Sequence, residues 1–313
     1  MQCIRLIEGY WPRQGAGILG GPPKGAKSVL ALEAAVSIAS GTPFLQSGRV
    51  VEPGPVLVAS LEGGRWLATD RLEKICRHRG LEMATLPVHV MDLGQLSRLR
   101  LDDPRYMRGL KDAAQRFVPK LIILDPLVRL HGGSENSASD ISALLENLRV
   151  IQVEVGCAIM LVHHNKRNVA KESRPGEDFR GSGDLHAWGD TNWSIRGDAH
   201  KEVTLKIEHR AAGNPNPVRY KLVVAHDEST MHLALVTPGP ADDSEQVPNA
   251  ELGLRHRALT KITEGAIGFG ALRDALGVSA GNLSTVCKAL DVEGLIEKDG
   301  RRWRLRSVPT PSH

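Results

Sequence analysis

A stretch rich in glycine and proline, Gly20–Ser28, carries residue types that bind phosphate. Its sequence is GGPPKGAKS, and it lies between an apolar run that ends at Leu19 and a helical pattern that begins near Lys27. Small residues let backbone amides surround a phosphate, a lysine neutralises phosphate charge, and a hydroxyl can hold Mg²⁺. Lys27 and Ser28 supply the last two groups, and the helix N-terminus adds a positive dipole. The stretch therefore predicts a site for a nucleoside triphosphate.

This loop departs at one position from the pattern G-x-x-x-x-G-K-[ST]. Gly21 is the first glycine, but Ala26 stands where the second is expected, and Gly25 comes one position early. If residue 26 needs a positive φ, alanine would weaken binding or turnover. Since alanine is the smallest alternative, we expect a working loop rather than a simple turn before a helix. The expected nucleotide-binding residues are Gly21, Pro22, Pro23, Lys24, Gly25, Ala26, Lys27 and Ser28.

Two acidic residues follow apolar runs that are typical of buried strands. Asp125 ends the run Leu121–Asp125, where an acid can hold Mg²⁺ together with Ser28. Glu62 comes just after the run Pro55–Ser60. Ligands of open α/β sheets lie at the carboxyl ends of the strands. We therefore expect Asp125 to bind magnesium and Glu62 to orient or deprotonate an attacking water; the alternative for Glu62 is a solvated loop carboxylate.

A histidine pair and a strand-end arginine are further candidates. His163 and His164 end an apolar run, and either side chain could contact the γ-phosphate and report its hydrolysis. No third ligand lies at close spacing, so we do not expect zinc. Arg210 ends the segment Lys206–Arg210 and could reach the nucleotide of a neighbouring subunit. The alternative for Arg210 is a surface arginine at a strand end.

Basic residues in two segments are candidates for binding nucleic acid. Lys166–Arg180 is a long charged loop, and long loops in compact domains tend to be functional. It could line a nucleic-acid channel, although a solvated loop is an equal alternative. Lys298–Arg306 (KDGRRWRLR) combines several cations with one aromatic residue, which suits contacts to phosphate backbones. The candidate contacts are Lys166, Arg167, Arg180, Lys288, Arg301, Arg302 and Arg304.

The hydrophobic pattern divides the chain into two domains. Short apolar runs alternate with amphipathic helical stretches, which indicates an α/β fold with a mostly parallel sheet and helices on both faces. After Asn192 strand-like segments follow one another without helices, so we expect an antiparallel extension. We assign this domain to residues 1–236. Residues 237–249 (TPGPADDSEQVPN) are expected to be a linker, and residues 250–313 a small domain with a short tail.

The small domain is expected to be a winged helix. The pattern predicts helices over Leu252–Thr263, Gly270–Leu276 and Ser279–Glu293, and the turn signal Asp299–Gly300 predicts a hairpin. The third helix would recognise DNA; the alternative is a winged helix that binds protein. Its candidate contacts are Ser279, Asn282, Ser284, Thr285 and Lys288.

The composition is typical of a globular protein. The chain has 313 residues, of which 41% are hydrophobic and 24% charged, which suggests about two domains. Its four cysteines include no CxxC pair and fit a reducing cytoplasm. There is neither an apolar run long enough to span a membrane nor a signal-peptide pattern. The net charge of +4 permits nucleic acid as a partner without establishing it.

Taken together, these motifs resemble the RecA/DnaB-type ATPases, and within them the plasmid-encoded RepA replicative helicases. The resemblance spans about residues 15–236 and rests, in order, on GPPKGAKSVLALEAAVSIASG, VLVASLEGG, LIILDPL, VHHNK and RGSGDLHAWGDTNWSIR. It implies a homo-hexameric ring with ATP and Mg²⁺ at subunit interfaces and single-stranded DNA in the channel. It also implies roles for the site: Lys27 and Ser28 bind phosphate and Mg²⁺, Glu62 is the catalytic carboxylate, Asp125 is the Walker B acid, His163 or His164 is the sensor, and Arg210 is the trans-acting finger.

Two departures from the family pattern bear on turnover. Ala26 replaces the glycine before the lysine, and Glu208 stands where DnaB-type proteins often carry a lysine. Our interpretation is an ATP-dependent motor on single-stranded or forked DNA, a replicative-type helicase of a plasmid, phage or integrated element. One alternative is an ATP-dependent DNA-binding regulator or recombination accessory without unwinding activity. The other is a nucleotide-gated binding protein whose hydrolysis is too slow to matter.

Overall fold

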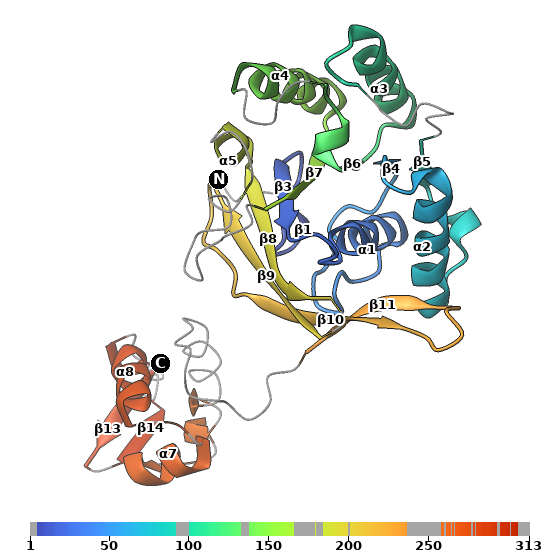
Figure 1. Ribbon diagram of the computed structural model, residues 1–313. Coiled ribbons are helices and arrows are strands. Elements are labelled where there is room, and N and C mark those ends of the chain that lie inside the picture. The colour runs from blue at the N-terminus through green and yellow to red at the C-terminus, as the bar shows by residue number, and fades with distance from the viewer. Residues whose placement is uncertain are drawn as a thin grey trace, which may run out of the picture. The chain divides into compact units, whose positions relative to one another are not determined.

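The chain divides into two compact units, Met1–Thr237 and Pro238–His313. The computed structural model (Figure 1) describes residues 5–91, 100–132, 138–165, 179, 184–199 and 201–236 of the first unit. In the second unit it describes residues 258–259, 261–263, 265, 267–276, 278, 280–292, 295–300 and 302–305. Among these residues, no helix is long and apolar enough to cross a membrane.

A nine-stranded sheet forms the centre of the first unit. All neighbours from β8 to β5 pair in parallel, and all neighbours from β8 to β11 pair antiparallel. This confirms the predicted parallel sheet with an antiparallel extension. In spatial order the strands are β11 (Met231–Leu235), β10 (Val218–Val224), β9 (Glu202–His209), β8 (Thr191–Asp198), β3 (Ala16–Gly21), β7 (Ala158–His164), β6 (Leu121–Asp125), β4 (Val56–Ser60) and β5 (Val88–Val90).

The sequence interpretation was incomplete for β8. Its first residues were assigned to the antiparallel extension, but β8 pairs in parallel with β3 through Gly17↔Thr191 and Gly20↔Ser194. Its other edge pairs antiparallel with β9. β8 thus belongs to both parts of the sheet. It joins the antiparallel extension to β3, the strand that leads into the loop Gly20–Ser28.

Helices cover both faces of the sheet, as predicted (Figure 1). Along β6, Leu121 and Ile123 pack in one core cluster with α1 and α2, whereas Ile122 and Leu124 pack in a second cluster with α3 and α4. Alternate residues of a strand point to opposite faces, so a strand buried on both sides must be apolar throughout. The helices are α1 (Lys27–Ser40), α2 (Gly64–His78), α3 (Pro104–Phe117), α4 (Ala138–Val155) and α5 (Asp184–Trp188), and 3₁₀ turns occur at Met83–Thr85 and Leu127–Arg129.

A short hairpin and a short helix were not predicted. The hairpin pairs β1 (Arg5–Ile7) with β2 (Trp11–Pro12) before β3 begins. Trp11 packs edge-on against Trp193 of β8, with 5.1 Å between the ring centroids. The helix α5 comes directly before β8 in the chain. Both elements are too short for a periodic pattern to reveal them.

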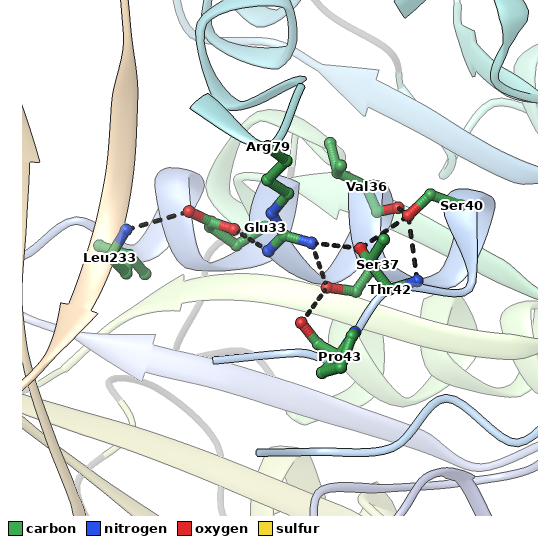
Figure 2. Close-up of polar contacts among 8 residues, drawn as sticks. All are labelled: Glu33, Val36, Ser37, Ser40, Thr42, Pro43, Arg79 and Leu233. Carbon is green, nitrogen blue, oxygen red and sulfur yellow. Dashed lines mark hydrogen bonds and ion pairs between the residues drawn. The ribbon is translucent and has the colours of Figure 1, made fainter. Parts of the chain in front are cut away.

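A polar brace fixes α1 against its neighbours (Figure 2). The Glu33 carboxylate, which is almost fully buried, pairs with the Arg79 guanidinium and accepts a hydrogen bond of 3.0 Å from the Leu233 backbone N–H. Arg79 also donates to the hydroxyls of Ser37 and Thr42, each at 2.8 Å. Breaking a buried ion pair by removing one partner is strongly destabilising. The brace therefore joins α1, the end of α2 and the edge strand β11, and it holds the helix that begins at the loop.

The second unit has its own small core. It contains β12 (Ile267–Gly268), α7 (Phe269–Leu276), α8 (Ala280–Val292), β13 (Ile296–Asp299) and β14 (Arg302–Leu305). The strands form an antiparallel sheet in the order β12–β14–β13, and Asp299 pairs with Arg302 across the predicted turn. Leu272, Leu283 and Leu290 are fully buried between these elements. Of the helix expected over 252–263, only residues 258–259 and 261–263 are described, and the winged-helix assignment stays a prediction.

Candidate functional site

The loop after β3 has a backbone that fits its unusual sequence. A Cβ on Gly21 would lie 2.2 Å from Cγ1 of Ile195, so there is no room for a side chain. The Gly25 N–H closes a turn on the Pro22 carbonyl at 3.2 Å. Ala26 has φ 62° and ψ 19°, in the left-handed region. The position therefore has the conformation that glycine favours, and alanine adopts it at a cost of about 1–2 kcal/mol.

The Lys27 side chain is folded back over this loop. Its ammonium donates to the carbonyl oxygens of Pro22 at 2.7 Å and Gly21 at 3.1 Å, and it lies 3.4 Å from Nδ1 of His164. Only 6% of Lys27 is exposed. Burial lowers the pKa of Lys27 to about 8, although the charges of Asp125 and Glu62 oppose the shift. A cation held among carbonyl oxygens at a helix N-terminus suits an incoming phosphate.

Asp125 lies at the end of β6, beside this lysine. Ser60 of β4 pairs with Asp125, and the Leu61 N–H donates to the Asp125 carbonyl at 2.7 Å. Burial raises the pKa of the Asp125 carboxyl, whereas a hydrogen bond from the Ser28 hydroxyl and the charge of Lys27 lower it. A hydroxyl and a carboxylate are oxygen ligands that Mg²⁺ accepts together with waters. These two side chains therefore fit the expected magnesium site.

Glu62 lies beyond the end of β4, on the same edge of the sheet. Its side chain is exposed, and its charge acts on both Lys27 and Asp125. This edge, where the parallel strands end, is called the carboxyl edge below. Trp66 lies nearby in the first turn of α2 and is 75% exposed. A solvent-facing carboxylate next to a buried lysine and a buried acid can orient water.

The two histidines differ in their relation to the loop. In the parallel pairing of β3 with β7, His163 lies opposite Gly20 and His164 opposite Gly21. Successive side chains of a strand point to opposite faces. His164 is the one that reaches Lys27, whereas His163 is completely buried. Of the two predicted sensors, His164 is therefore the one brought to the loop.

Sequence reasoning did not single out Asn165, the next residue along. Its backbone N–H donates to the Gly21 carbonyl at 3.1 Å, and its side-chain amide donates to the Ser194 hydroxyl at 3.3 Å. Asn165 thus joins β7, β3 and β8 where the loop begins. Its place at the end of the motif VHHNK was the only available signal, and a pattern of residue types does not reveal which strands an amide will join.

Arg210 and the loop lie at opposite ends of the parallel strands. His209 pairs with Thr191, and Thr191 pairs with Gly17 near the start of β3. We call this edge, where the parallel strands begin, the amino edge. A strand rises about 3.3 Å per residue, so the length of β3 separates Arg210 from the loop by roughly 20 Å. Within one chain Arg210 does not join the other candidates; its side chain is 54% exposed.

The candidate nucleic-acid contacts are only partly described. Lys288 on α8 is exposed, as is Arg302 on β14. Arg304 is exposed too, but its guanidinium lies 2.9 Å from Glu297 and 3.8 Å from Asp299, so part of its charge is neutralised. Outside the described residues lie Lys166, Arg167, Arg180, Ser279 and Arg301, and the side chains of Asn282 and Thr285 are likewise not described.

The described residues contain neither a cluster of metal-ligating side chains nor an exposed thiol. In the described segments, no three His, Cys, Asp or Glu side chains cluster as a metal site. Cys76, Cys157 and Cys287 are buried free thiols. Burial raises the pKa of Cys157 to about 12, which makes a reactive thiolate at neutral pH unfavourable.

Comparisons with known proteins support the fold. A family model described as an AAA domain matches residues 3–169. A DnaB-like replicative helicase, solved in a study of its interactions with primase, superposes with a TM-score of 0.53 at 16% identity over 70% of this chain and 57% of the helicase chain. The RadB recombinase superposes with a TM-score of 0.50 at 15% identity over 70% of this chain and 90% of its own. The expected RecA/DnaB-type fold is confirmed.

Proposed function

This chain belongs to the AAA domain family, and from this premise we propose that it is an ATP-driven motor acting on nucleic acid. In finer terms, we propose a replicative-type DNA helicase of a plasmid, phage or integrated element, working as a homo-hexamer on single-stranded or forked DNA. The similarity to a DnaB-like replicative helicase and to the RadB recombinase supports this proposal. The closeness to RepA-type helicases rests on the sequence motifs alone.

The observation that carries the proposal is the convergence of Lys27, Ser28, Asp125 and Glu62 on the carboxyl edge. Lys27 would pair with the β- and γ-phosphates, for which it exchanges its contacts to the Pro22 and Gly21 carbonyls. Ser28 and Asp125 would hold Mg²⁺, which neutralises charge that develops on the phosphates. Two buried strands and a helix hold the backbones of these residues, so binding would require rearrangement of side chains only, as at Lys27.

The hydrolytic step needs a group that handles water. Glu62 is exposed next to the buried pair, so it would accept a proton from, or orient, the water that attacks the γ-phosphorus. His164 is the last residue of β7 and lies 3.4 Å from the Lys27 ammonium, where it would sense whether the γ-phosphate is present. The contact of His164 with Lys27 would then change with the state of the nucleotide.

The position of Arg210 supports a multi-subunit motor. Since Arg210 lies on the amino edge, it would act on a nucleotide only if another subunit presents that nucleotide to it. An arginine supplied in this way stabilises the charge of the transition state for phosphoryl transfer. A ring in which the amino edge of one subunit faces the carboxyl edge of the next meets this requirement.

The proposal is tested by three measurements on the purified full chain. We expect ATP hydrolysis that single-stranded DNA stimulates, separation of a forked duplex that requires ATP and Mg²⁺, and a hexamer mass with nucleotide. The Lys27→Ala variant serves as the control for contaminating ATPases. Hydrolysis without strand separation would favour the DNA-binding regulator, and nucleotide binding without turnover would favour the gated binding protein. A chain that stays monomeric and binds no nucleotide would refute the proposal.

A further inference from the structure

The side chain of Asp190 connects three elements at the amino edge. Its Oδ2 accepts the backbone N–H of Ala16, the first residue of β3, at 2.9 Å and a guanidinium N–H of Arg149 on α4 at 2.6 Å. Its Oδ1 lies 3.9 Å from Nη1 of Arg210. The backbone adds a further tie, since the Arg210 N–H donates to the Asp190 carbonyl at 3.0 Å. One carboxylate thus faces two guanidinium groups.

The two arginines share this carboxylate unequally. Arg149 also donates to Gln152 and to the Trp188 carbonyl, and its guanidinium lies 5.1 Å from the centre of the Trp188 ring. The contacts with Trp188 join α4 to α5, so Arg149 has a structural role within its own chain. Arg210 has the longer contact to Asp190, and its side chain is 54% exposed. A long, solvent-exposed ion pair restrains a side chain without consuming its hydrogen-bonding capacity.

We propose that Asp190 and Arg149 position Arg210 for its action on the nucleotide of a neighbouring subunit. Asp190 restrains the direction of the Arg210 side chain and ties its backbone to the start of β3. Arg149 occupies Oδ2 and thereby prevents Asp190 from closing a tight, bidentate pair with Arg210, which would hold the guanidinium within its own chain. This inference rests on the proposed function, because it needs Arg210 to act in trans.

The experiment mixes two inactive variants of the full chain. Glu62→Gln subunits keep Arg210 but do not hydrolyse ATP at their own loop; Arg210→Ala subunits keep the loop but lack the arginine. In a mixed ring, an Arg210→Ala loop that faces a Glu62→Gln neighbour has every group it needs. A one-to-one mixture should recover about a quarter of the wild-type rate, the random share of such interfaces.

Asp190→Asn is then placed in one type of subunit at a time. In the Glu62→Gln subunit, which donates the arginine, it should lower the recovered rate about tenfold because a misplaced catalytic group loses much of its effect. In the Arg210→Ala subunit it should change the rate by less than about twofold, since no arginine is positioned there. A merely structural role of Asp190 would lower the rate in both placements, and so would misfolding.

Two further variants complete the design. Glu202→Gln in the donating subunit is the matched control, because Glu202 forms a similar half-exposed pair with Arg219 at 3.3 Å on the same sheet; it should leave the recovered rate unchanged. Arg149→Met in the donating subunit should lower the rate, because Asp190 is then free to hold Arg210 within its own chain. Adding Asp190→Asn should cause no further loss, because the carboxylate that captures Arg210 is gone.

The outcomes separate two failures. If the simple mixture recovers no activity, the trans-acting arginine is wrong, and the inference falls with the proposed function. If the mixture recovers activity but Asp190→Asn has equal effects in the two placements, or no effect, the proposed function stands and the role of Asp190 is refuted.

Discussion

The two edges of the nine-stranded sheet treat their charged groups in opposite ways. At the carboxyl edge Lys27 and Asp125 are buried, with only 6% and 9% exposed. Burial lowers the pKa of Lys27 and raises the pKa of Asp125, and each shift favours the neutral form of the side chain. At the amino edge Asp190, Arg149 and Arg210 are about a third to a half exposed. Buried charges are unfavourable until opposite charges solvate them, whereas exposed charges are stable in water.

The two edges therefore suit different partners, a bound ligand at the carboxyl edge and a group from another chain at the amino edge. The carboxyl edge brings a cation and two acids together from three segments, so a triphosphate and Mg²⁺ could complete their charge within one subunit. At the amino edge Arg149 and Asp190 pair with each other within the chain, whereas Arg210 has only a loose contact to Asp190. Arg210 is therefore available for a stronger contact with a group from another chain, which is the physical reason for our proposal that it acts on a neighbouring nucleotide.

Removing one cation from each edge should have the largest and most different effects. Arg210→Ala should lower kcat for ATP hydrolysis by roughly 10³-fold and leave the Kd for ATP unchanged. Lys27→Ala should instead raise the Kd about 100-fold, or about 2.8 kcal/mol, because a charged hydrogen-bonding group is lost. Steady-state hydrolysis and equilibrium nucleotide binding measure the two effects. Equal losses of affinity in both variants would show that the edges do not differ in this way.

The burial of Lys27 at the carboxyl edge should make ATP binding depend on pH. The pKa of Lys27 is lowered to about 8 in the free protein, and bound phosphate would return it toward its ordinary value of about 10.4. Below pH 8 the lysine is already charged, so affinity should be flat. Above pH 8 binding must take up a proton, and affinity should fall toward about tenfold per pH unit.

Calorimetry in buffers with different ionisation enthalpies checks this expectation at pH 9, where proton uptake should approach one per site. Lys27→Arg is the matched control, because a guanidinium stays charged throughout this range and its profile should be flat. A wild-type profile as flat as that of the arginine variant would contradict the assigned role of burial.

The carboxyl edge was easier to predict from sequence than the amino edge, for a physical reason. The loop, Asp125 and Glu62 each follow an apolar run, and parallel strands place all such ends together. The partners of Asp190 come from β3, α4 and the end of β9, far apart in sequence, and only the pairing of strands brings them together. The parallel pairing of β8 was missed for the same reason, because a single strand's pattern does not contain its neighbours.

The smallest expected effect concerns the loop itself, where the chain departs from the usual pattern. Ala26 is held at φ 62°, so Ala26→Gly should relieve strain and raise the free energy of unfolding by about 1 kcal/mol, partly offset by the greater freedom of glycine in the unfolded chain. Ala113→Gly, inside helix α3, is the matched control and should lower stability by about 1 kcal/mol.

Chemical denaturation of both variants, with and without ATP, measures this contrast. Because alanine already adopts the left-handed conformation, Ala26→Gly should change the Kd for ATP by less than about twofold, since the loop amides keep their directions. A large gain in affinity together with the gain in stability would mean that alanine distorts the phosphate cradle. In that case the strain at residue 26 would limit nucleotide binding at the carboxyl edge, and not only the stability of the fold.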